Sequence, residues 1–246
     1  MRTLALAVAV LLGVVMNGQA EASGAFTGRV GATAGNYSQD ETFTDTGCCG
    51  NPIGTEFTFD YSTGQYGVLG GLGFTISRFF VDAGLEFTQY AKDRDTDFDG
   101  IEDTAFYRSD FLLTAGVFLG DRWTTFLGFR HSTQGDGFFS EDLGFTADGP
   151  FFGAGVSFRP GQKFAVGASA AYNVLTYSQE GVVFDNVDLN GLSVKLQGSF
   201  LGTPHSVFLR WQRFNGDQSE AGSFDYEQTE DYVNVGYQAT FDFLTW

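Results

Sequence analysis

Positive charge is scarce in this sequence, in which 13 Lys and Arg stand against 30 Asp and Glu, giving a formal net charge of −17. Because nucleic-acid phosphates are held by clustered Lys and Arg, this balance disfavours nucleic acid as a partner. The chain has two His and two Cys, and it contains no P-loop, dinucleotide fingerprint or Cys/His zinc spacing. The cysteines, Cys48 and Cys49, are neighbours. A disulfide between neighbours needs a strained ring, so we expect two small loop residues, with a vicinal disulfide as the alternative.

Long apolar runs are also missing. The run Leu4–Val15 has 12 residues, whereas a membrane-spanning helix needs roughly 20. It follows a positive N-terminus and precedes the small-x-small site Ala20-Glu21-Ala22. These features predict a secretory signal peptide over 1–22, cleaved after Ala22. The remainder, 23–246, then forms one domain, because no linker or second compositional region follows.

What the sequence has in abundance is Gly, Phe and residues in alternation, with 34 Gly and 28 Phe against 4 Pro. Short turn-like connections are expected at 77–78, 120–122, 159–162 and 202–205. Long acidic connections are expected at 38–56, 91–105, 135–149, 179–187 and 215–230. The two kinds alternate strictly, with room for two strands of about 10 residues in each repeat. We therefore predict ten strands, with eight or twelve as alternatives if 54–77 is divided differently.

Side-chain parity within these segments indicates two unlike faces. Phe79, Val81 and Leu85 share one face of a strand, and Asp82 and Glu86 share the other. Strand-end aromatics suit the membrane boundary: Phe79, Trp123, Phe158, Phe164 and Trp246. The fold class is therefore all-β, an antiparallel up-and-down transmembrane barrel with short periplasmic turns and long acidic extracellular loops.

This architecture resembles the bacterial outer-membrane β-barrel superfamily over residues 24–246, including a terminal aromatic residue, Trp246. In the usual C-terminal signal the last aromatic shares parity with the apolar row, whereas Trp246 is out of step with Phe241 and Phe243. The resemblance implies the cell outer membrane as location, lipid and lipopolysaccharide as surroundings, and the barrel-assembly machinery as a partner.

Charged residues of both signs fall on the inward parity of several strands. They are Asp60, Asp82, Glu86, Arg108, Asp110, Arg130, Lys195, Arg210 and Asp242. Because unpaired buried charge is costly, we expect them to pair across the lumen. They form either a polar plug or the lining of a narrow ion or solute path.

The second acidic segment contains Asp95, Asp97, Asp99 and Gly100 in the pattern D-x-D-x-D-G. Alternating carboxylates before a Gly turn suit calcium, and the segment resembles the acidic half of EF-hand loops. The twelfth position is Phe106 where that family has Glu, so Asp103 or Glu102 has to substitute. We expect either a solvated loop or weak calcium binding.

The segment His131-Ser132-Thr133-Gln134-Gly135 loosely resembles a stretch of outer-membrane phospholipase A and of lipid A deacylases. That resemblance implies His131 as base and Thr133 as nucleophile, on the lipid-facing side of the strand. Glu141 and Asp142 are nearby in sequence, but neither is identified as the orienting acid. Omptin proteases need acidic pairs and a His at the outer rim of the lumen. By parity His131 faces the lipid, and His205 falls in an expected periplasmic turn, so neither His meets this requirement.

These features favour a non-enzymatic surface protein of the outer membrane, with an envelope-structural or surface-interaction role through its acidic loops. A narrow passive channel and a lipid hydrolase centred on His131 are the alternatives. No cofactor is expected beyond weak calcium.

Overall fold

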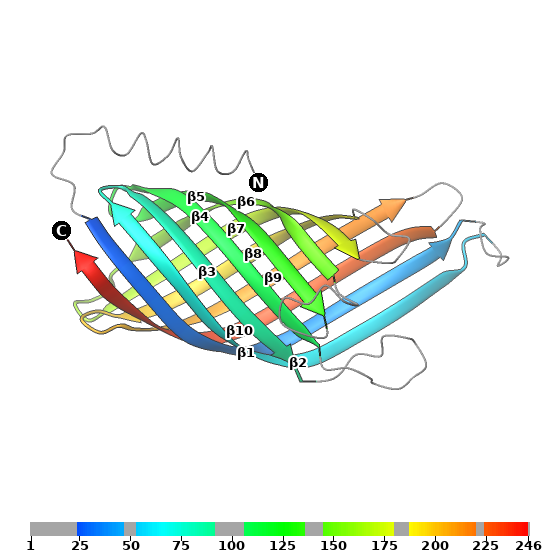
Figure 1. The fold of residues 1–246 in the computed structure, drawn as a ribbon, viewed down its shortest axis with the longest axis horizontal. Helices are drawn as coiled ribbons and strands as arrows, with labels where there is room; N and C mark the ends of the chain where they lie inside the picture. Colours follow the sequence, from blue (N-terminus) through cyan, green and yellow to red (C-terminus); the bar gives the residue numbers. More distant parts are fainter. Residues whose placement is uncertain are drawn as a thin grey trace.

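The computed structural model describes residues 24–46, 53–91, 106–135, 145–179, 187–219 and 224–245. Ten antiparallel strands form a closed barrel in which each strand pairs with its neighbours in sequence and β10 pairs with β1 (Figure 1). The strands are β1 (Gly24–Asp45), β2 (Glu56–Ile76), β3 (Phe79–Tyr90), β4 (Tyr107–Leu119), β5 (Trp123–Gly135), β6 (Phe145–Phe158), β7 (Phe164–Gln179), β8 (Val187–Phe200), β9 (His205–Ser219) and β10 (Phe224–Thr245). The predicted fold class and strand number are confirmed, and 54–77 holds the single strand β2.

Tight turns lie at one end of the barrel, where the first and last described residues also lie (Figure 1). Ser77, Gly120 and Gly202 have φ values of 54°, 71° and 79°, which lie in the left-handed region that a tight reversal often needs. Short turns in this architecture face the periplasm. The opposite end is therefore called the outer end below.

The outward faces of the strands form an apolar belt. Leu127 on β5, Val235 on β10 and Val68 on β2 are each about 60% exposed, with values of 60%, 62% and 59%. Inward neighbours such as Arg130 and Asn234 are buried. A backbone in hydrocarbon has to satisfy its hydrogen bonds internally, and the closed ladder does this without an edge. No helix in the described part of the chain is long and apolar enough to cross a membrane.

Several strands are longer than predicted. Residues 38–45, 215–219 and 224–230, expected in loops, continue β1, β9 and β10 beyond the other strands (Figure 1). Residues 145–149, also expected in a loop, begin β6. The reason is physical: above the membrane the outward face contacts water, so a strand there carries no apolar row and reads as a loop.

One inward assignment, that of Asp60, was wrong. Asp60 lies on the exposed face of β2, whereas Thr63 and Gln65 are buried on the inward face. Asp60 pairs directly with Asp40 in the β1–β2 register. The apolar row Phe57, Phe59 and Tyr61 shares the parity of the buried Thr63 and Gln65, so in this outer part of β2 the apolar row does not mark the lipid-facing side.

Candidate functional site

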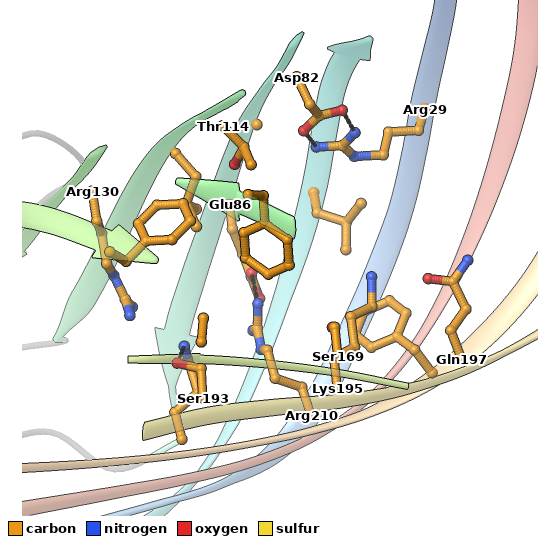
Figure 2. A pocket seen from close by; sticks show the side chains of 18 of the residues that line it. Arg29, Asp82, Glu86, Thr114, Arg130, Ser169, Ser193, Lys195, Gln197 and Arg210 are labelled. Atoms are coloured by element: carbon orange, nitrogen blue, oxygen red, sulfur yellow. Dashed lines mark hydrogen bonds and ion pairs between the residues drawn. The ribbon is translucent and has the colours of Figure 1, made fainter. Parts of the chain in front are cut away.

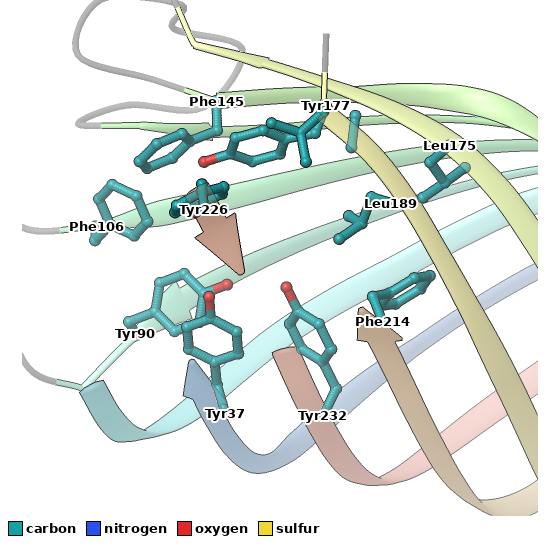
Figure 3. Close-up of a cluster of buried hydrophobic side chains, with 12 residues drawn as sticks. Tyr37, Tyr90, Phe106, Phe145, Leu175, Tyr177, Leu189, Phe214, Tyr226 and Tyr232 are labelled. Carbon is teal, nitrogen blue, oxygen red and sulfur yellow. The ribbon is translucent and has the colours of Figure 1, made fainter. Parts of the chain in front are cut away.

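The outer half of the lumen holds a ring of aromatic side chains from seven of the segments that line it (Figure 3). This aromatic collar consists of Tyr37, Tyr90, Phe106, Phe145, Tyr177, Phe214 and Tyr232. Neighbouring rings follow one another from Phe214 through Tyr232, Tyr37, Tyr90, Phe106 and Phe145 to Tyr177, with centroids 4.7–6.4 Å apart. Their placement inside the lumen follows from inward parity above the membrane belt.

The collar closes the lumen at this level. Tyr37 is 1% exposed and Tyr232 is 2% exposed. The cavity left among the collar, Arg108 and Glu230 has a volume of about 10 Å³. That volume holds about one water molecule. The described rings therefore pack closely at this level of the lumen.

A ladder of hydrogen bonds joins the polar groups on the inner faces of β1 and β10. Its members are Tyr37, Gln39, Glu41, Tyr226, Gln228, Glu230 and Tyr232. Tyr37 donates to Gln39 at 2.6 Å, and Tyr232 donates to Glu230 at 2.6 Å. Residues two apart share a strand face, so each side chain reaches the next. The ladder satisfies buried polar atoms and makes this wall rigid.

Beneath the collar lies an ion cluster made by Arg108, Asp110, Arg130 and Ser132. Both guanidinium groups donate to the Asp110 carboxylate, with 2.8 Å between Arg108 Nε and Oδ2 and 2.8 Å between Arg130 Nη2 and Oδ1. The hydroxyl of Ser132 also donates to Asp110. Arg108 further stacks over the Tyr232 ring at 4.1 Å. One carboxylate thus holds two buried cations, which leaves the cluster with an excess positive charge.

Two more ion pairs lie nearer the turns. Arg210 on β9 donates both Nη groups to Glu86 on β3 at 2.7 Å, across the lumen between strands far apart in the barrel. Arg29 on β1 contacts both carboxylate oxygens of Asp82, with Nη2 2.6 Å from Oδ1. Each pair is bidentate, a geometry that adds strength to a charge-assisted hydrogen bond.

Around these pairs the lumen is hollow, and Figure 2 shows their side chains among those that line the cavity. A cavity of about 480 Å³ is lined by Arg29, Asp82, Glu86, Arg130, Lys195 and Arg210, together with Phe and small polar residues. A second cavity of about 290 Å³ at the turn end shares Thr124, Ser169, Lys195 and Gln197 with it. The two cavities together are called the vestibule below.

The structure thus places six of the nine charged residues named for the lumen in ion pairs: Asp82, Glu86, Arg108, Asp110, Arg130 and Arg210. Lys195 differs, because none of the described carboxylates lies within ion-pair distance of it, and its ammonium group lies 4.4 Å from the centre of the Phe208 ring. Asp242 lies in an exposed stretch near the turn end. Sequence reasoning missed Arg29, although its parity with Thr33 and Tyr37 marks it as inward.

On the outer surface, His131 of β5 lies opposite Asp148 of β6, with 2.5 Å between Nδ1 and Oδ1. Both side chains are partly exposed, at 40% and 45%. Thr133 lies two residues further on the same outward parity, and its buried hydroxyl has no hydrogen-bond partner among the described residues. Asp148 is the acid that the described structure places beside His131, and the two acids considered from sequence, Glu141 and Asp142, lie outside the described residues. The sequence signal that could have identified Asp148 is the alternation in β6, where Phe145 and Ala147 face inward and Asp148 therefore faces outward.

The remaining predicted sites fall outside the described residues. They are the signal peptide, Cys48 and Cys49, the acidic set Asp95, Asp97, Asp99 and Asp103, and Trp246. Within the described residues, no group of three or more His, Cys, Asp or Glu side chains is arranged to hold a metal ion.

No protein-family model and no curated protein matches the chain. Similar solved structures include the outer membrane protease OmpT from Escherichia coli, with 12% identity, 88% of this chain and 97% of that chain covered, and a TM-score of 0.53. They also include an outer membrane channel from Pseudomonas putida F1, with 13% identity, coverage of 86% and 96%, and a TM-score of 0.39. Neisserial surface protein A shares 13% identity, coverage of 87% and 97%, and a TM-score of 0.32. At these identities the likeness shows the fold alone.

Proposed function

We propose that this chain, which has the fold of the bacterial outer-membrane β-barrel superfamily, is a non-enzymatic surface protein that presents a negatively charged sheet to cationic partners outside the cell. The observation that carries the proposal is a lumen closed by the aromatic collar beneath strands that extend beyond the other walls. The apolar belt supports its location in the outer membrane.

The extended strands carry an acidic outer face, defined here by the exposed residues Asp40, Glu56, Asp60, Asp217 and Glu227. Asp40 lies directly opposite Asp60, and Glu227 lies directly opposite Asp217. Like charges in this position destabilise a sheet, so stability does not account for them. A negative patch attracts cationic macromolecules and speeds their encounter, which does account for them.

Basic residues are nearly absent from this part of the barrel. Within 38–45, 56–62, 213–219 and 224–231, Arg213 is the one basic residue, and its guanidinium group lies 3.7 Å from Asp231. The acidic outer face therefore keeps its negative charge unneutralised by its own strands.

The experiment measures binding of a fluorescent decalysine peptide to the purified barrel in neutral detergent, by fluorescence anisotropy. The variant Asp40→Asn/Asp60→Asn/Glu227→Gln removes three exposed carboxylates. At about 0.2–1 kcal/mol for each exposed ion pair, the loss of three pairs should weaken binding roughly 3- to 160-fold. The control Asp121→Asn removes a carboxylate from a periplasmic turn and should bind like wild type. Equal binding by the triple variant contradicts the proposal.

The collar also argues against the channel alternative. A cavity of about 10 Å³ at the level of the collar leaves no room for a hydrated ion to pass. We expect planar bilayers containing the wild-type barrel to show no steady single-channel conductance. Reproducible conductance steps would instead support a passive channel and refute closure by the collar.

The contact between His131 and Asp148 favours one second candidate, a lipid hydrolase acting at the membrane surface. An acid that orients a histidine is the arrangement that activates a hydroxyl nucleophile. Thr133 lacks the hydrogen bond to His131 that this reaction needs, which is why the hydrolase ranks second. Ester release from phospholipid or lipopolysaccharide tests it. Release that is lost in both His131→Ala and Asp148→Asn supports a hydrolase, and release unchanged in both removes it.

Protease chemistry of the omptin type is not favoured by the histidines. His131 faces outward, and His205 lies at the turn end, where its Nδ1 is 2.6 Å from the Tyr237 hydroxyl. Neither imidazole therefore lies in the outer part of the lumen.

A further inference from the structure

The vestibule contains positive charge that its own carboxylates do not balance. Asp82 is held by Arg29, and Glu86 is held by Arg210, each through both carboxylate oxygens. Lys195 lies among these four groups, so its electrostatic neighbours include two cations as well as two carboxylates that are already paired. The ammonium group is thus without an anionic partner of its own among the described residues.

Arg130 adds positive charge beside the same cavity. It shares the Asp110 carboxylate with Arg108, so one carboxylate balances two guanidinium groups there. Its side chain lines the vestibule, as does that of Lys195 (Figure 2). A cavity lined by an excess of charge of one sign attracts ions of the other sign, so this one favours an anion.

The rest of the lining mixes apolar and polar side chains. Phe80, Phe126, Phe151 and Phe208 supply apolar ring surface, Ser169 and Ser193 supply hydroxyl groups, and Asn173, Gln197, Gln212 and Gln238 supply amides. A cavity of about 480 Å³ falls within the ordinary range for small-molecule sites, about 300–1,000 Å³. Apolar ring surface beside placed polar groups is a combination that such sites use to orient a ligand.

From this arrangement we propose that the vestibule is a binding site for a small organic carboxylate with an apolar body, entering from the periplasmic end. The carboxylate contacts Lys195, and the apolar body lies against the Phe rings. Entry is from the turn end because the second cavity of about 290 Å³ opens the site there, and the collar closes the other end.

The test is calorimetric titration of the purified barrel in neutral detergent with sodium benzoate. Benzoate should bind wild type, and Lys195→Gln should bind it about 10-fold more weakly or worse, since a charge-assisted contact is lost. Lys195→Arg keeps the charge and should stay within about 3-fold of wild type. The control Lys163→Gln removes an exposed lysine from a periplasmic turn and should change nothing.

Two further probes separate the parts of the proposal. Benzyl alcohol has the ring without the charge, and acetate has the charge without the ring, so both should bind at least about 10-fold more weakly than benzoate. Equal binding of benzyl alcohol refutes the role of Lys195, and equal binding of acetate refutes the apolar subsite. Absence of benzoate binding to wild type overturns the site. Heat-modifiable migration on a gel verifies that each variant is folded. If Lys195→Gln does not fold, the comparison of Lys195→Arg with wild type and the two further probes still test the site.

Discussion

Replacing Asp110 by Asn should be among the most destabilising single changes in the barrel. The carboxylate accepts hydrogen bonds from Arg108, Arg130 and Ser132, and the three side chains are almost fully buried. The substitution leaves two guanidinium groups beside each other without the carboxylate that both of them contact. Removing one partner of a buried ion pair costs about 3–5 kcal/mol, and here one carboxylate serves two cations. We therefore expect a loss of at least about 3 kcal/mol in the free energy of unfolding.

The matched comparison is Asp82→Asn. Its pair with Arg29 is about one quarter exposed, at 25% and 27%, so water screens the cation that remains. The expected cost is about 1 kcal/mol. Unfolding is followed by urea titration of barrels in phospholipid vesicles, with tryptophan fluorescence and gel migration as independent readouts.

A double variant tests the cause. Removing Arg130 together with the carboxylate, as Asp110→Asn/Arg130→Gln, takes away one of the stranded cations. It should be more stable than Asp110→Asn alone, because neighbouring sites in one network are not additive. If Asp110→Asn costs no more than Asp82→Asn, or if the double variant is the least stable, the ion cluster does not act as described.

Three further predictions rest on other parts of the chain. Tyr90→Ala/Phe145→Ala opens the collar, so planar bilayers should show conductance steps that wild type lacks; silent bilayers would mean that other side chains close the lumen. Gly128→Ala should cost about 1–3 kcal/mol of unfolding free energy, because the new methyl carbon would lie 2.3 Å from both the Leu113 carbonyl oxygen and the Phe151 ring. The control Gly167→Ala should be nearly neutral, because the nearest atom to its new methyl carbon is 3.7 Å away. Equal urea midpoints for the two variants would refute this contrast. Calcium at tenfold above its dissociation constant should stabilise wild type by about 1.4 kcal/mol and Asp97→Ala/Asp99→Ala by nothing; identical melting with and without calcium contradicts a calcium site.

The membrane-embedded part of the fold could be predicted from sequence because hydrocarbon imposes one rule on it. In β3, Phe79 and Leu85 face outward, and Asp82 and Glu86 face inward, as alternation requires. The rule fails where β1 leaves the membrane. Gln39 is buried and Asp40 is exposed, yet both are polar, so the sequence there cannot be told from a loop.

Partners inside the lumen were harder to predict than the inward residues themselves. Parity names Glu86 and Arg210 as inward, but the two are 124 positions apart and meet because closure brings β3 and β9 to facing walls. Register, not composition, decides such pairs. The same holds for Asp148, which meets His131 because the β5–β6 ladder places them opposite each other.

Where the lumen is closed and where it is hollow follows from side-chain size more than from polarity. The outer half is lined by Tyr, Phe, Leu and Gln, whose volumes fill the narrow interior of a ten-stranded barrel. Near the turns the inward positions of β7 are Gly167, Ser169 and Ala171, and those of β2 include Gly71 and Gly73. Small residues cannot fill the same cross-section, so a cavity remains there. The ion pairs lie at the boundary, where water from the hollow half still reaches the pair of Arg29 and Asp82 but not the cluster around Asp110. The same gradient of size therefore separates a filled outer half of the lumen from a hollow half nearer the turns.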